Sequence, residues 1–87
     1  MITVAKQDER SFQVTVNSGT QTMHAVSVDP AYAEKLTAGK ASTERLVEVS
    51  FEFLLAREPN TSILRSFDLP VIGRYFPEYE TTITGML

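Results

Sequence analysis

Residues 42–58 read STERLVEVSFEFLLARE, and this segment decides the fold. Between residues 47 and 53, apolar and polar side chains alternate without a break, which is the period of a half-buried strand. Placed at about 100° per residue, however, Glu44, Glu48 and Glu52 fall on one narrow face, and large apolar residues cover nearly all the rest. The segment therefore fits both a strand and a largely buried helix.

The residues that flank this segment favour the helix. Ser42 can accept hydrogen bonds from the free amide groups of a first helical turn. Arg57 lies near the negative end of the helix dipole, and Pro59 stops the segment. We therefore predict a helix here, with a strand over residues 46–55 as the alternative.

Three strands are predicted before this helix. Residues 12–16 alternate strictly between apolar and polar side chains, and residues 2–5 alternate more weakly. A third strand is predicted over residues 20–28, where the one histidine of the chain, His24, shares a face with valines. A polar loop and the turn-forming residues 17–19 separate these strands, so an antiparallel meander is expected.

Short helices are predicted on both sides of the central one. Asp29 and Pro30 form a start signal, and Gly39 ends that first helix. Asn60 can cap a helix over residues 61–67.

Asp68 and Pro70 repeat the start signal for a last helix over residues 69–76. Residues 78–87 are expected to be a loose tail or to dock on a partner. The predicted fold is α+β: one domain over residues 1–87, with a three-stranded antiparallel β-meander in 1–28 and three to four short helices in 29–77.

Length and composition limit the class of protein. The 87 residues are 43% apolar and 22% charged, which suits one small globular domain. The chain has no cysteine, and its start resembles neither a signal peptide nor a transit peptide, so we expect a cytoplasmic protein without disulfides or membrane contact. The net charge of -3 disfavours nucleic acid as a partner, because such binding depends on a concentrated basic face.

No recognisable catalytic set occurs in the sequence. His24 is the only histidine and there is no cysteine, so a nucleophile paired with a base and a transition-metal site both lack the necessary groups. The four glycines are isolated, and no phosphate-binding loop can be written through them. Glu44, Glu48 and Glu52 are interpreted as a solvated helix face. We expect no catalytic residue, no metal site and no cofactor.

The candidates for a binding surface are arginine and aromatic residues of the C-terminal half, because these residue types are enriched at the centres of interfaces. They are Arg65, Arg74, Tyr75, Phe76 and Tyr79. The alternative is that the nearby arginines form local salt bridges with the acidic residues Glu58, Asp68 and Glu78.

The same half of the chain carries a resemblance. Residues 53–64 read FLLAREPNTSIL and residues 66–80 read SFDLPVIGRYFPEYE. They resemble a family of small, uncharacterised bacterial proteins whose C-terminal half follows the patterns FLLxREPxxSIL and SFDLxVIxxYFPEYE. The resemblance supports the helix within residues 42–58 and implies no activity or catalytic residue.

Three functions are compatible with these observations. The first is a non-enzymatic protein-interaction or regulatory module, expected to be a homodimer formed through a sheet edge or the face of residues 51–55. The second is a nucleic-acid-binding or antitoxin-like regulator, suggested by the order of strands followed by helices. The third is an enzyme that uses Arg65, Arg74 and Tyr75 on a small anionic ligand.

Overall fold

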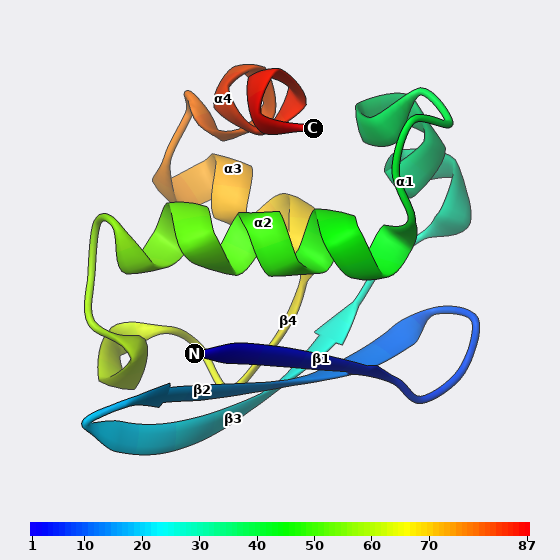
Figure 1. Cartoon of the computed structure of the whole chain (residues 1–87). Coiled ribbons are helices and arrows are strands. Elements are labelled where there is room, and N and C mark those ends of the chain that lie inside the picture. Colours follow the sequence, from blue (N-terminus) through cyan, green and yellow to red (C-terminus); the bar gives the residue numbers. More distant parts are fainter.

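Four strands form one sheet, and the four α-helices lie on one face of it (Figure 1). The structure is a computed structural model that describes residues 1–87. The strand order is β1-β2-β3-β4, in which β1 to β3 are antiparallel neighbours and β4 runs parallel to β3. The α+β class is confirmed, and the sheet has a fourth strand that was not predicted. The strands span Ile2–Lys6 (β1), Ser11–Ser18 (β2), Thr20–Ser27 (β3) and Ser66–Asp68 (β4).

The meander has the register that its alternating side chains predict. Phe12 pairs with Val26, and Val14 pairs with His24. All four side chains are buried, so they form the sheet face that packs against the helices. Gly19 connects β2 to β3 with a φ of 81°, a left-handed conformation that costs glycine little because it has no Cβ.

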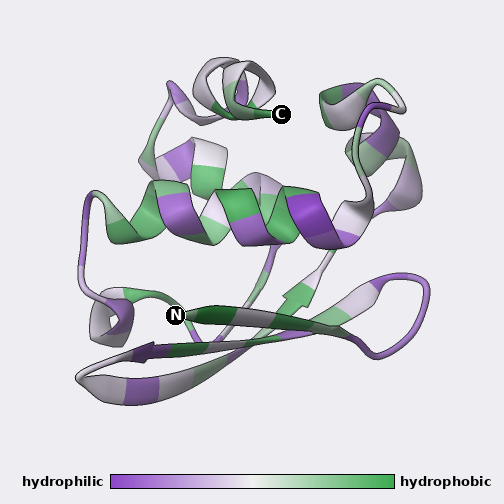
Figure 2. Cartoon of the chain, viewed as in Figure 1, coloured by the Kyte–Doolittle hydropathy of each residue, from purple (hydrophilic) through white to green (hydrophobic).

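Residues 46–55 are helical, so the strand alternative is wrong. Helix α2 spans Thr43–Leu55, and Ser42 accepts a hydrogen bond from the Arg45 amide at 3.0 Å. Both green and purple stretches occur along α2 in Figure 2, with the apolar side packed on the sheet and on the other helices. No helix of the structure, α2 included, has the length and apolar content needed to cross a membrane.

Helix α1 spans Pro30–Thr37 and begins at the predicted residue. Asp29 accepts a hydrogen bond from the Ala31 amide at 2.8 Å, as expected for a helix cap. Its end differs from the prediction, because Ala38 adopts a φ of 52° before Gly39 adopts one of 73°. The left-handed turn therefore uses an alanine as well as the glycine.

The helix predicted over residues 61–67 is wrong. Only a short 3-10 turn, η1 (Asn60–Ser62), forms there, and the chain then extends into β4. The Arg65 carbonyl accepts a hydrogen bond from the Ala25 amide at 2.7 Å, and Phe67 packs against the core. Pairing with a strand 41 residues earlier in the chain therefore outweighs the local helix signal.

The helix predicted over residues 69–76 forms in two shorter pieces. They are the 3-10 turn η2 (Leu69–Val71) and helix α3 (Ile72–Tyr75). The predicted cap by Asp68 is also wrong, because the Asp68 carboxylate accepts a hydrogen bond from the Ser27 hydroxyl on β3.

The C-terminal residues form helix α4, Tyr79–Met86, which docks on the domain and is not a loose tail. Tyr79 and Ile83 lie four residues apart on one helix face, and both are fully buried. Glu80 joins α4 to α1, because it accepts a hydrogen bond from the Tyr32 hydroxyl at 2.8 Å.

The chain closes its own core. Its accessible surface of 5043 Å² is close to the roughly 5,100 Å² expected for a monomer of 9.7 kDa. No buried side-chain nitrogen or oxygen lacks a hydrogen-bond partner. Phe51, Phe53 and Leu54 are at most 4% exposed. The prediction that residues 51–55 form a dimer face is therefore wrong, because this face is used inside the monomer.

The buried Tyr79 predicts a loss of stability at alkaline pH. The Ser50 hydroxyl donates to the Leu46 carbonyl at 2.7 Å, so the Tyr79 hydroxyl must donate to the Ser50 oxygen, also at 2.7 Å. Burial raises the pKa of Tyr79 from 10.0 to about 12. Folding thus favours the protonated phenol, and this contribution is complete below pH 10 and declines as the pH rises toward 12.

We compare the free energy of unfolding of the native chain with that of Tyr79→Phe. The difference, native chain minus variant, should be about 2 kcal/mol smaller at pH 11.5 than at pH 9. Urea unfolding of both proteins at the two pH values measures this difference. Tyr32, whose pKa burial also raises, is present in both proteins and cancels. An unchanged difference would mean that Tyr79 ionises equally easily in the folded and unfolded chain.

Candidate functional site

An apolar groove lies where the C-terminal end of α2, the segment after η1, β4 and α3 meet. Its volume is about 420 Å³, and eight of its ten lining residues are hydrophobic. Two of the lining residues, Glu58 and Ser62, are polar. The lining residues are Leu54, Glu58, Ser62, Ile63, Leu64, Phe67, Val71, Ile72, Tyr75 and Phe76.

The groove has a buried floor and an exposed rim. Leu54, Ile63 and Ile72 belong to the core and are at most 6% exposed. On the rim, the Leu64 side chain is 47% exposed and the Tyr75 side chain is 67% exposed. Exposed apolar side chains grouped around a hollow are typical of a binding surface.

Two of the five predicted binding residues line this groove, and two more are neighbours of its rim residues in the sequence. Tyr75 and Phe76 line it, while Arg65 and Arg74 are exposed and directly follow or precede the rim residues Leu64 and Tyr75 in the chain. Neither arginine makes an ion pair. The local salt-bridge interpretation therefore does not describe Arg65 or Arg74.

Arg57 is the arginine that does form a local salt bridge. Its Nε lies 3.4 Å from an oxygen of Glu78, and its guanidinium carbon lies 3.6 Å from the centre of the Phe53 ring. The Arg57 side chain also donates to the Phe53 carbonyl at 3.0 Å. Arg57 therefore makes its contacts within the fold, at the C-terminal end of α2. Its guanidinium group is not free to bind a ligand, unlike those of Arg65 and Arg74.

Tyr79 does not belong to the binding surface. Its side chain is fully buried, its hydroxyl bonds to Ser50, and its ring lies 5.3 Å from the Phe53 ring. The spacing of Tyr79 and Ile83, four residues apart, is a helical core pattern that could have revealed this role.

A buried network below the groove holds the segment that leads into β4. His24 Nδ1 lies 2.7 Å from the Leu64 carbonyl, which can only accept, so Nδ1 carries a proton. His24 Nε2 lies 2.9 Å from the Thr22 hydroxyl, and Asn60 Nδ2 donates to that hydroxyl at 2.9 Å and to the Thr20 carbonyl at 2.7 Å. A neutral histidine satisfies all of these groups, so the His24 side chain serves the fold by bonding to its neighbours.

The acidic helix face of α2 is an ion-paired surface. Arg45 lies 2.7 Å from Glu48 and 3.8 Å from Glu52. No group of three or more His, Asp or Glu side chains is arranged so that it could hold a metal ion.

A second hollow of about 280 Å³ is lined by six residues, of which one is hydrophobic. The ion pair of Arg10 with Asp29, at 3.6 Å, lines it, together with the hydrogen-bonded pair of Ser27 and Asp68. Because these groups satisfy one another, this hollow offers less to a ligand than the apolar groove does.

No known protein family, curated protein or solved structure matches this chain. The resemblance of residues 53–80 to a small bacterial family therefore stays a prediction. The function proposed next rests on the geometry of the groove.

Proposed function

We propose that this chain is a small non-enzymatic protein-interaction or regulatory module whose groove binds an extended segment of another protein. The observation that carries this proposal is the exposed apolar rim of Leu64 and Tyr75, each of which is next in the sequence to an arginine without an ion pair. Arginine and tyrosine beside a pocket of this kind are the residue types that dominate binding energy at interfaces.

The sheet edge beside the groove suits an extended partner. β4 is the last strand of the sheet, so one of its sides has no neighbouring strand. Successive residues of a strand direct their backbone groups to opposite sides, and the Arg65 carbonyl bonds to β3. The backbone groups of Ser66 therefore face the open edge, where a peptide can add as a further strand.

The arginines that neighbour the rim residues in the sequence suggest the chemistry of the partner, although the one charged residue that lines the groove is Glu58. Arg65 and Arg74 are the two arginines whose charge no carboxylate of the chain balances. An extended segment with a large apolar residue for the groove and an acidic residue beside it complements both features.

The nucleic-acid alternative has less support. The chain has a net charge of -3, and four of its basic side chains, Arg10, Lys35, Arg45 and Arg57, are paired with carboxylates. Their pairing lowers the positive potential that phosphate binding requires.

The test begins with selection of heptapeptides from a displayed random library on the immobilised protein. We expect enrichment of sequences that combine a large apolar residue with Asp or Glu. Arg74→Glu should then weaken the binding of the enriched peptide roughly 5- to 10-fold, as measured by fluorescence anisotropy. The reason is that a repulsion replaces an attraction worth up to about 1 kcal/mol.

Lys40→Glu is the matched control, because Lys40 is also exposed and without an ion pair but lies between α1 and α2. Equal weakening by both variants would point to net charge and not to the groove. Salt-sensitive binding of a DNA duplex, with no peptide enriched, would favour the nucleic-acid alternative.

A further inference from the structure

The outer edge of β1 presents backbone groups that the sheet does not use. β1 pairs only with β2, so its other side, the β1 edge, has no neighbouring strand. Met1 and Asn17 exchange two backbone bonds at 2.9 Å, and the Gln7 amide donates to the Ser11 carbonyl at 2.8 Å. Bonding residues alternate along an antiparallel pair, so the even-numbered residues of β1 direct their N–H and C=O groups to the edge. These residues are Ile2, Val4 and Lys6.

Nothing in β1 protects this edge from an additional strand. Sheet edges of natural proteins are commonly blunted by a proline, a bulge or a charged side chain within the strand. β1 pairs with β2 in unbroken register from Ile2 to Lys6 and contains no proline. Its one charged side chain, Lys6, lies at its end. The β1 edge is therefore a template to which an extended segment can add.

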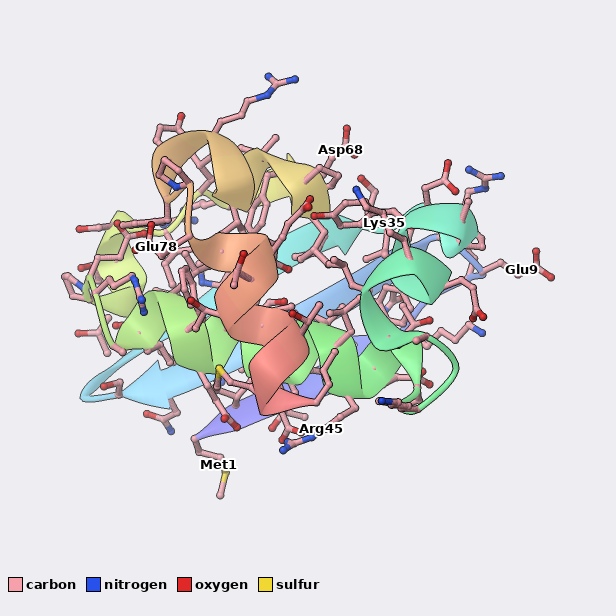
Figure 3. The ribbon with its side chains drawn as sticks, turned by 90° about the horizontal axis from the view of Figure 1, so that it is seen from above. Met1, Glu9, Lys35, Arg45, Asp68 and Glu78 are labelled. Carbon is pink, nitrogen blue, oxygen red and sulfur yellow. The ribbon has the colours of Figure 1, made fainter.

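A charged stripe of α2 lies beside this edge. α2 packs against β1, α1 and α4, and it lies above β1 in Figure 1. Seen from above in Figure 3, Met1 of the N-terminus and Arg45 of α2 project from the same margin of the molecule. The charged residues of α2 are Glu44, Arg45, Glu48 and Glu52. Because three carboxylates accompany one guanidinium group, this stripe is acidic, and we call it the acidic stripe.

The spacing of the glutamates matches the spacing of side chains on a strand. Glu44, Glu48 and Glu52 follow one another at intervals of four residues, which is about 6 Å along a helix. Every second side chain of a strand points to the same face, at intervals of about 6.8 Å. Ile2 and Val4 pack against the core on the helix side of the sheet, so the side chains opposite them in an added strand also point to that side. An added strand thus presents successive side chains to successive glutamates.

We propose that the β1 edge and the acidic stripe together bind an extended segment of another protein that carries lysine or arginine at every second position. The segment adds antiparallel to β1, which is the more stable arrangement per residue. Its backbone bonds to β1, and its basic side chains pair with the glutamates of the stripe. A second copy of the chain fits less well, because pairing of two β1 edges would bring both acidic stripes to the same side of the joined sheet, where they repel.

The spacing is tested with two labelled heptapeptides in fluorescence anisotropy at low ionic strength. One alternates threonine and lysine, and the other has the same composition with its lysines adjacent. The alternating peptide should bind at least about 5-fold more tightly, because only its lysines can all face the stripe. Both peptides carry the same charge, so equal binding of the two, or no binding of either, would overturn the proposal.

The charge of the stripe is tested by a double variant. Glu48→Gln with Glu52→Gln should weaken binding of the alternating peptide roughly 5- to 10-fold, since both carboxylates are lost and Arg45 is left without its partners. Glu9→Gln with Glu34→Gln is the control, because it removes the same charge at exposed positions outside α2. Equal weakening by both double variants would mean that net charge alone attracts the peptide, and would overturn the proposal.

The backbone contact is tested by methylating nitrogens of the alternating peptide. In an antiparallel strand, the lysine N–H groups face β1 and the threonine N–H groups face away. Methylation of the lysine nitrogens should therefore abolish binding, and methylation of the threonine nitrogens should preserve it. Equal binding of both methylated peptides would overturn the proposal.

Two further measurements separate this surface from its alternatives. In sedimentation equilibrium, a mass of the free chain that doubles from 9.7 kDa with concentration, and that Glu48→Gln with Glu52→Gln raises further, would assign the β1 edge to a second copy and overturn the proposal. β1 and β4 are at opposite ends of the strand order. Arg74→Glu should therefore leave binding of the alternating peptide unchanged, and failure at the β1 edge would not affect the proposal for the groove.

Discussion

Phe51→Ala should lower the free energy of unfolding by about 3–5 kcal/mol, since it removes a fully buried aromatic ring. Phe51 lies on α2, and its ring centre is 5.3 Å from the His24 ring on β3 and 6.1 Å from the Phe67 ring on β4. The side chain therefore joins the central helix to the two strands beside the groove. A domain of 87 residues has a total stability of about 4–13 kcal/mol, so the variant should be near the limit of folding.

Thermal and urea unfolding followed by circular dichroism measure this effect. The midpoint should fall by at least about 12 °C. Tyr75→Ala is the control, because it truncates another aromatic residue that is 67% exposed and should change stability by less than about 0.5 kcal/mol. Equal small effects of the two variants would contradict the packing of α2 on β3 and β4.

The elements that the sequence predicts correctly are those whose signals are local. The period of two in residues 12–16 requires only neighbouring side chains, and it gave the buried face of β2. Residues 46–55 fit two periods equally well, and the Ser42 cap resolved them, because its hydrogen bond to the Arg45 amide exists only in a helix.

The elements that the sequence misses depend on distant partners. β4 has three residues, too few to show a period, and it is a strand because the Arg65 carbonyl reaches the Ala25 amide. The expected capping residues Asn60 and Asp68 both bond to β3 instead. A polar side chain next to a proline or a turn thus signals a cap only when no other donor or acceptor lies closer.

The candidate site follows the same division. Residue type alone selected Tyr75 and Phe76, which line the groove, and Arg65 and Arg74, which neighbour its rim residues in the sequence. Leu64 was missed because its exposure depends on β4. Tyr79 was assigned to the surface by residue type, although its spacing to Ile83 places it in the core.

His24→Leu should lower the free energy of unfolding by about 2–4 kcal/mol. The His24 side chain is 2% exposed and bonds to the Leu64 carbonyl and the Thr22 hydroxyl. Leucine can make neither bond, and each buried polar group left without a partner costs about 1–3 kcal/mol. Urea unfolding measures the change in the free energy of unfolding. Met23→Leu is the control, because Met23 lies on the same strand but is 53% exposed, and this change should have little effect.

The location of the damage distinguishes a loosened β4 from a general loss of stability. The bond from His24 to Leu64 fixes the residue that precedes Arg65, whose carbonyl accepts the Ala25 amide. In His24→Leu, hydrogen exchange at the Ala25 amide should therefore accelerate more than exchange at the amide of Phe51 in the middle of α2. Equal acceleration at both amides would mean that the network stabilises the whole domain and does not hold β4 in particular. Preferential exchange at Ala25 would mean that β4 is loosened. The variant should then also bind a peptide more weakly, since β4 provides the sheet edge for the peptide and contributes Phe67 to the lining of the groove.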